Sequence, residues 1–218
     1  MLLNIVIGHG VDIPTQIQHT GITNFLKRYI DQCQNNHPGK CKKPEPVSLP
    51  KRVVAVGSHS GDVVKLVEDA GKDAEYLALS HSWGSGQGPP KTLRTNLKAH
   101  KDSIPPSGNS KTLHDAIEIT RLLQIPYLWV DSLCIVQDDP LDWEDESAKM
   151  ALIYADASLT IAASSAPNGE TGLLADRAKV HRIQGVDTRG VGYKIYVREQ
   201  PSHYNFVEQF NYHDNLNG

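Results

Sequence analysis

From residue 75 onward the sequence alternates between short apolar segments and longer amphipathic ones, and this alternation restricts the possible folds more than any other feature. The apolar segments run from Tyr76 to Ser80, from Tyr127 to Val130 and from Leu159 to Ala163. Each is apolar at successive positions, as in strands that are buried on both faces of a parallel sheet. Strands that alternate with helices are typical of α/β domains. We therefore predict an α/β fold with a mostly parallel sheet and covering helices.

The first covering helix is predicted to begin at Thr112. Asp115 follows three residues later, a spacing typical of a capping box, in which the threonine hydroxyl accepts a free backbone N–H. Pro126 disfavours the α conformation at Ile125 and ends the helix there. The side chains expected to face the core are Leu113, Ala116, Ile117, Thr120 and Leu123.

The second covering helix is predicted to begin at Asp142, with Glu144, Asp145 and Glu146 near the positive end of the helix dipole. Dipole stabilisation accounts for one of these glutamates. The side chains expected to face the core are Trp143, Ser147, Met150, Ala151 and Tyr154.

The sequence pattern of residues 1–70 predicts a helix and a β-hairpin ahead of the α/β segment. Two β-like runs, 52–56 and 62–67, are separated by the turn-forming residues 57–61. We expect residues 1–70 to pack as a lead-in on a core formed by residues 71–180. Residues 181–218 are expected to contribute an edge strand at 193–197 and a poorly ordered polar tail. Helical spacing within 22–33 places six residues on one face: Ile22, Phe25, Leu26, Tyr29, Ile30 and Cys33.

Composition excludes several classes of protein. A length of 218 residues favours one domain, and a net charge of -3 with a pI near 6.3 provides no cationic field for a nucleic acid. The apolar runs are shorter than the roughly 20 residues of a membrane helix. Three cysteines, an odd number, do not form a disulfide framework and fit a reducing compartment. We expect a cytoplasmic protein that binds neither nucleic acid nor membrane.

Short polar clusters follow all three predicted strands. Because parallel strands end at one edge of a sheet, where ligands bind in α/β folds, the clusters are expected to converge on one site. Short polar residues at strand ends are also what turns and helix caps require, so each cluster has a structural alternative. The clusters are Ser80, His81, Ser82, Trp83 and Gly84 after the first strand, Asp131 and Ser132 after the second, and Ser164 with Ser165 after the third.

Two of these side chains, and one on the second covering helix, are candidates for catalysis. His81 is an acid, base or ligand, or else packs beside Trp83. Asp131 ends an apolar strand, where an ionised carboxylate needs a partner. If its role is only structural, that partner is a backbone N–H, Arg121 or Lys111. Glu146 is the third, as the functional carboxylate of the second helix. Cys134 has no basic neighbour in sequence, which favours a buried, inert thiol.

A metal site is a weaker hypothesis. Cys33, His37 and Cys41 are each four residues apart and could supply three zinc ligands, with His59 as a fourth. The spacing differs from a C-x-x-C knuckle, and Cys33 also belongs to the apolar helix face, so we predict no metal. The glycine-rich loop 84–90 lacks the Lys-Ser/Thr of a P-loop and favours a mobile loop.

Several long motifs resemble, in order, the HET domain of fungal heterokaryon incompatibility proteins. The resemblance covers roughly residues 76–177. The motifs are 76–84 (YLALSHSWG), 111–117 (KTLHDAI), 127–139 (YLWVDSLCIVQDD), 142–144 (DWE) with Glu146 and Met150, 153–154 (IY), 159–164 (LTIAAS) and 172–174 (GLL) with Arg177.

The resemblance implies a cytosolic fungal signalling or interaction module that triggers cell death when unlike hyphae fuse, through protein partners or self-association. The family is also distantly similar to TIR domains, which implies a TIR-like, flavodoxin-like three-layer core. Some TIR domains cleave NAD by means of a glutamate, so an NAD glycohydrolase is the alternative. Glu146, Asp131 and His81 would then be catalytic, in a nucleotide pocket lined by Ser80, Ser82, Trp83, Gly84, Ser132 and Ser164.

The sequence departs from the family after Arg177. Family members usually continue into an Arg-x-Trp-x-x-Gln-Glu motif, and nothing after Arg177 matches it. We therefore expect a truncated version of the domain.

Overall fold

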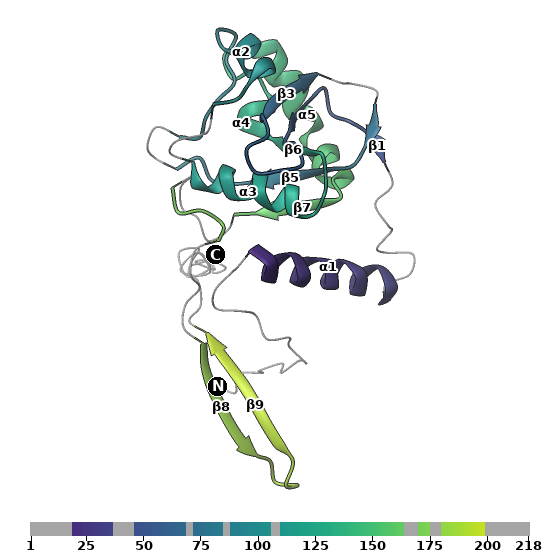
Figure 1. Cartoon of the computed structure of the whole chain (residues 1–218), viewed down its shortest axis with the longest axis vertical. Helices are drawn as coiled ribbons and strands as arrows, with labels where there is room; N and C mark the ends of the chain where they lie inside the picture. The colour runs from purple at the N-terminus through teal and green to yellow at the C-terminus, as the bar shows by residue number, and fades with distance from the viewer. Residues whose placement is uncertain are drawn as a thin grey trace, which may run out of the picture. The chain divides into compact units, whose positions relative to one another are not determined.

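The computed structural model describes residues 19–36, 46–68, 72–84, 88–105, 110–163, 170–174 and 180–198 (Figure 1). The chain divides into two compact units. One is Gln18–Ala175, and the other combines Met1–Ile17 with Asp176–Gly218. The boundaries predicted at residues 70 and 180 stay a prediction.

A five-stranded mixed sheet forms the centre of the Gln18–Ala175 unit, with strand order β3-β2-β6-β5-β7. The strands β5 (Tyr76–Ser80), β6 (Tyr127–Val130) and β7 (Leu159–Ala162) are parallel to one another, as predicted. The hairpin β2 (Arg52–Ala55) and β3 (Lys65–Glu68) is antiparallel and joins the sheet beside β6. The α/β fold is confirmed. The sheet is mixed rather than mostly parallel, because the predicted lead-in hairpin extends it.

Burial differs between the central strands and the edge. Four of the five β5 residues and three of the four β6 residues are buried, as expected for strands covered on both faces. The β7 residues alternate between half-buried and exposed. The prediction that this third strand is buried on both faces was therefore wrong, because β7 pairs only with β5 and lies at the edge of the described sheet.

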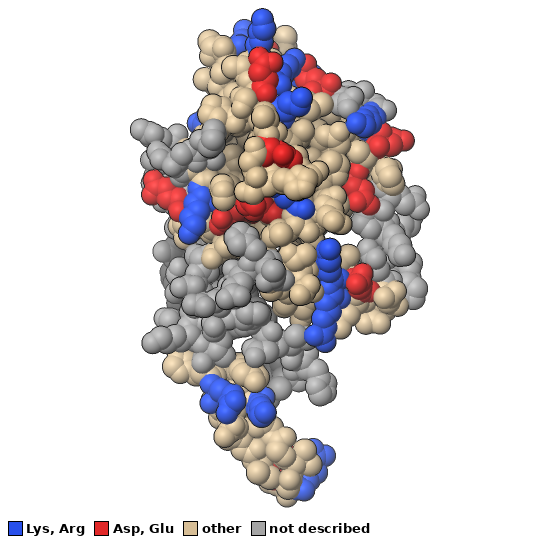
Figure 2. All heavy atoms as spheres, viewed as in Figure 1, with Lys and Arg blue, Asp and Glu red and all other residues tan. Residues whose placement is uncertain are grey.

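Five helices accompany these strands in the described residues: α1 (His19–Asn36), α2 (Leu97–Asp102), α3 (Lys111–Leu122), α4 (Asp131–Cys134) and α5 (Pro140–Asp156). Two short strands, β1 (Val47–Ser48) and β4 (Asp73–Ala74), pair outside the main sheet. No helix in the described part of the chain is both long and apolar enough to cross a membrane. Lys and Arg are interspersed with Asp and Glu on the face shown in Figure 2.

The cap of α3 differs from the prediction. Ser110 is the N-cap, and its Oγ accepts the N–H of Leu113 at 3.3 Å. Thr112 lies inside the helix and is buried, so the capping box beginning at Thr112 was wrong. The helix ends at Leu122 and its predicted apolar face is confirmed, with Leu113, Ala116, Ile117 and Thr120 buried and Leu123 partly buried.

Asp115 has a different role from the predicted cap. Its Oδ2 accepts the N–H groups of Leu173 and Leu174 at 2.8 and 3.1 Å, which attaches residues 170–174 to α3. Gly172 makes this approach possible because its φ is +79°, and a Cβ there would lie 2.6 Å from that Oδ2.

We expect Gly172→Ala to lower the free energy of unfolding by about 1–3 kcal/mol, because it combines a left-handed backbone with a clash against a carboxylate. Urea denaturation measures the change. Gly21→Ala is the matched control, since Gly21 lies in α1 with nothing within 4 Å of its Cβ position. That control should stabilise the chain by up to about 1 kcal/mol. A Gly172→Ala variant as stable as the wild type would contradict the assigned geometry.

Helix α5 begins two residues before its predicted start. Asp139 is the N-cap, and its Oδ1 accepts the N–H of Leu141 at 3.2 Å. The buried positions are Asp142, Glu146 and Ile153, whereas Trp143 is 53% exposed.

The predicted inward face of α5 was correct only in part. Met150 and Tyr154 are partly buried, but Trp143 and Ala151 are exposed. The reason is that a buried arginine on β2 binds Asp142, and hydrophobic periodicity cannot detect such a contact.

The second unit contains a β-hairpin of β8 (Val180–Val186) and β9 (Gly192–Arg198). The predicted strand 193–197 is confirmed within β9. It pairs with β8 in a separate two-stranded sheet and does not extend the main sheet among the described residues. Strand β8 was not predicted, because Arg182, Gln184 and Gly185 interrupt its apolar pattern.

Candidate functional site

The residues that follow β5 and β6 meet at the carboxyl edge of the sheet. Leu79 pairs with Val130 in the parallel register, so His81 and Asp131 leave neighbouring strands at almost the same level. The Nδ1 of His81 lies 3.8 Å from the Oδ1 of Asp131. Trp83 donates its indole N–H to the Oδ2 of Asp131 at 3.1 Å. The predicted convergence is thus seen for these residues. We call His81, Trp83 and Asp131 the strand-end cluster.

Asp131 is the centre of the strand-end cluster. Besides Trp83, its carboxylate accepts the N–H of Ser132 at 2.7 Å. This matches the backbone alternative considered for Asp131 and not the salt bridge, because Arg121 instead binds the carbonyl of Val56 and the carboxylate of Glu118. The side chain is 21% exposed, so a solute can reach it.

Burial changes the acidity of two groups beside Asp131. The side chain of His81 is only 4% exposed, and burial lowers its pKa although the charge of Asp131 opposes the shift. Burial raises the pKa of Tyr154 to about 12, and Asp131 adds to that shift. The Tyr154 hydroxyl donates to the carbonyl of Leu79 at 3.3 Å. Tyr154 was predicted only as a core residue, and its proximity to the cluster depends on the path of α5.

A loop after β5 borders the cluster. The Oγ of Ser82 accepts the N–H of Gly84 at 3.3 Å. The ammonium group of Lys91 lies 4.6 Å from the centre of the Trp83 ring, a cation–π arrangement. Lys91 was not among the predicted site residues, since no sequence motif links it to Trp83. Ser80 is exposed at the end of β5.

The same loop is fastened to the segment after β6. Thr92 donates its backbone N–H to the carbonyl of Ser132 at 2.9 Å and accepts the N–H of Gln137 at 2.9 Å. Its hydroxyl lies 3.0 Å from the Nδ1 of His100, which is buried. These bonds hold the loop bearing Lys91 beside Asp131 without any metal or disulfide in the described residues.

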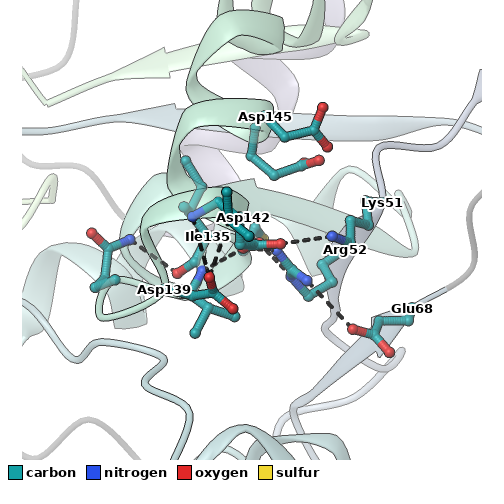
Figure 3. Close-up of polar contacts among 12 residues, drawn as sticks. Lys51, Arg52, Glu68, Ile135, Asp139, Asp142 and Asp145 are labelled. Atoms are coloured by element: carbon teal, nitrogen blue, oxygen red, sulfur yellow. Dashed lines mark hydrogen bonds and ion pairs between the residues drawn. The ribbon is translucent and has the colours of Figure 1, made fainter.

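A buried ionic network contacts the last residue of α4, and we call it the Arg52 network (Figure 3). Arg52 of β2 is 2% exposed and donates its Nε to the carbonyl of Cys134 at 2.7 Å. Its guanidinium also pairs with Asp142 of α5 and lies 3.4 Å from Glu68. Lys51 reaches the other oxygen of Asp142 at 2.7 Å. The network therefore ties β2, α4 and α5 together.

The network keeps Asp142 ionised. Burial by itself would raise the pKa of this carboxyl, but the hydrogen bonds from Arg52 and Lys51 and the N–H of Val136 outweigh it and hold the pKa well below its usual range. The sequence contained no signal for this network, because the charged side chains that pair in it are 16 to 91 residues apart.

Glu146 lies on α5 one turn after Asp142 and is fully buried. Its Oε1 accepts from Lys149 at 3.0 Å, while its Oε2 has no hydrogen-bond partner in the described part of the protein. Among the described residues, no hydrogen bond or ion pair joins Glu146 to His81 or Asp131. The role predicted for Glu146 therefore stays a prediction.

The other predicted site residues are Ser164 and the Cys and His candidates for a metal site. Ser164, His37 and Cys41 lie outside the described residues, so their predicted roles stay predictions. Cys33 is half-buried in α1, and no group of three metal-binding side chains occurs in the ranges that the structure describes. Cys134 is buried, as predicted, and burial raises the pKa of its thiol to about 12.

Acidification tests the burial of His81. Its folded pKa is below the unfolded value of about 6.5, so the unfolded chain binds the proton more readily. The associated stability is present above about pH 6.5 and is lost as pH falls through the folded pKa. We expect the free energy of unfolding to fall from about pH 7.5 to 5.5, and to fall less in His81→Gln.

Urea denaturation at several pH values measures this slope. His100 is buried, with its pKa lowered by burial, and contributes to the slope in both proteins. His59→Gln is the control, because that side chain is 85% exposed, and it should keep the wild-type slope. An unchanged slope in His81→Gln would disprove this assignment.

Comparison with known proteins identifies the family. The heterokaryon incompatibility protein (HET) family model matches residues 76–209, which is more than half of the chain and includes the strand-end cluster. No curated protein and no solved structure matches the chain. The extent of the family match shows that this chain belongs to the heterokaryon incompatibility protein (HET) family.

Proposed function

We propose that this chain is a cytoplasmic signalling module of fungal non-self recognition, which triggers incompatibility cell death by associating with itself or with a protein partner. The family match over residues 76–209 carries the proposal. The described surface supports it, because α5 exposes three large apolar side chains, Leu141, Trp143 and Leu152, at 78%, 53% and 66%. Exposed apolar side chains of this size are suited to binding another protein.

Inducible expression of the full chain in a fungal host tests the proposal. We expect growth arrest with the wild-type chain. Asp142→Ala should abolish the response, because it disrupts the Arg52 network, whereas Asp102→Ala alters an exposed carboxylate at the end of α2 and should retain it. Normal growth in the presence of abundant folded wild-type protein would refute the signalling function.

An NAD glycohydrolase is the second candidate. It is favoured by three buried polar atoms at the sheet edge or on α5 that have no hydrogen-bond partner among the described residues: the Nδ1 of His81, the Oγ of Ser132 and the Oε2 of Glu146. Buried polar atoms usually have partners, and those that lack them are candidates for binding a ligand. In such a reaction Glu146 would stabilise the positive charge that develops on the ribose as the bond to nicotinamide breaks. Its burial means that α5 would have to shift for NAD to reach it.

NAD consumption by the purified chain decides this candidate. We expect turnover to fall at least about a hundredfold in Glu146→Gln if this carboxylate is catalytic. Glu144→Gln is the matched control, because Glu144 lies two residues away on the exposed side of the same helix. Absence of turnover in the wild type, or equal turnover in both variants, excludes this role for Glu146.

A further inference from the structure

Helix α5 carries a strip of apolar side chains on its outer side. Leu141, Ala148, Leu152 and Ala155 are all exposed. Their spacings of seven, four and three residues place them on one face of the helix. Asp142, Glu146 and Ile153 lie on the side that is buried against the sheet. We call the four exposed residues the α5 strip.

We infer that the α5 strip binds the α5 strip of a second copy of this chain, with the two helices antiparallel and a twofold axis passing beside Ala148. This inference rests on the proposed self-association and specifies its surface. A twofold axis requires a surface that is complementary to itself. The sequence of the strip and the charges beside it meet this requirement in two respects.

The strip is first complementary to itself in the size of its side chains. A twofold axis at Ala148 places Leu141 of one copy opposite Ala155 of the other, so that a large side chain meets a small one at both ends. The small side chains of Ala148 face each other in the middle. Helices with small residues at the contact approach to about 8 Å between their axes. Leu152 then covers the aliphatic part of Glu144 on the second copy.

The charged side chains beside the strip are also complementary to themselves. Asp145 and Lys149 flank the strip on one side, and in an antiparallel pair each side of one helix faces the same side of the other. The twofold axis sets Lys149 of one copy within about 3 Å, measured along the helix axis, of Asp145 of the other. Lys149 already binds Asp145 and Glu146 in its own chain at 2.7 and 3.0 Å. Pairing therefore joins two such groups into one network, in which each Lys149 lies beside the Asp145 of both copies. Parallel helices would offer no such symmetric match.

Thiol cross-linking of the full chain tests the arrangement. The background is Cys33→Ser with Cys41→Ser, and Cys134 stays in place because it is buried. Into this background, Ala148→Cys, Ala155→Cys or Ala99→Cys is introduced. Each protein is treated at about 100 μM with a bismaleimide that spans about 8 Å, a concentration well above a micromolar dissociation constant.

We expect Ala148→Cys to cross-link into dimers at least about tenfold faster than the other two. The two Ala155 positions of an antiparallel pair are about 21 Å apart along the helix, beyond the reach of the reagent. Ala99 is exposed on α2 and reports random collisions. Equal rates at Ala148 and Ala155 would overturn the antiparallel arrangement, and a rate at Ala148 no higher than at Ala99 would overturn the α5 surface.

Sedimentation provides a second measurement. Leu152→Glu changes an exposed side chain, so the variant should keep the wild-type unfolding midpoint while its dimer dissociation constant rises at least about tenfold. Unaltered dimerisation in Leu152→Glu would contradict the inferred surface. These results are independent of the growth assay: growth arrest by a chain that dimerises through another surface refutes this inference alone, and dimers that cause no arrest refute the proposed function alone.

Discussion

We expect Asp142→Ala to lower the free energy of unfolding by about 3–5 kcal/mol, because it leaves a buried charge without its main partner. Arg52 is 2% exposed and pairs with Asp142, which is 7% exposed. In the variant, Arg52 still donates to the carbonyl of Cys134 and keeps its longer ion pair with the partly exposed Glu68, which compensate less of its charge than Asp142 does. Removing one partner of such a pair costs far more than the pair contributes over apolar residues.

Guanidinium denaturation of the purified chain measures this loss. Asp145→Ala is the matched control, because that carboxylate is exposed and pairs with Lys149 on the surface, so its removal should cost less than about 1 kcal/mol. Similar losses in the two variants would show that the Arg52 network does not stabilise the unit.

The same network makes the free energy of unfolding depend on pH in the acidic range. The folded pKa of Asp142 is below its unfolded value of about 3.9, so its contribution is present above about pH 4 and is lost as pH falls further. Asp142→Ala should therefore show a flatter dependence of stability on pH in this acidic range.

Trp129→Ala should lower the free energy of unfolding by a similar amount, about 3–5 kcal/mol, through loss of a large buried side chain. Trp129 lies in the middle of β6 with no exposed surface. Its ring packs edge-to-face on Tyr154, with the ring centres 5.4 Å apart. Removing it opens a cavity between the sheet and α5 that these neighbours cannot fill.

The control for this variant is another tryptophan. Trp143→Ala removes a side chain that is 53% exposed on α5, and we expect the free energy of unfolding to change by about 1 kcal/mol or less. Denaturant titration of both variants makes the comparison. Equal losses at Trp129 and Trp143 would place the helix on the sheet in a different rotation from the one described.

Much of the fold was predictable because local pattern and burial agree in the central strands. The runs 76–80 and 127–130 are apolar on both faces, and the structure buries them on both faces. The apolar face of α3 was also predictable, since its core contacts repeat with the helical period. Prediction failed where a polar side chain decides the orientation. Trp143 was expected inside, but the ion pair between Asp142 and Arg52 turns α5 so that Trp143 is exposed.

The candidate site was predictable to the same extent. Strand ends in a parallel pair share an edge, so His81 and Asp131 could be brought together from the sequence alone, and the structure has them 3.8 Å apart. Lys91 over Trp83 could not be predicted, because the loop that carries it is positioned by bonds from Thr92 to Ser132 and Gln137.

Local sequence patterns were sufficient to predict the central strands, the helices α3 and α5 and the polar clusters that follow the strands, because these depend on short-range periodicity and on the residues at strand ends. The mixed sheet, the pairing of Arg52 with Asp142 and the outward side of α5 emerged from the folded chain alone. Those features depend on the pairing of residues distant in the chain. A buried charge accepts only the partner that the fold brings within hydrogen-bond distance, and no local pattern specifies that partner.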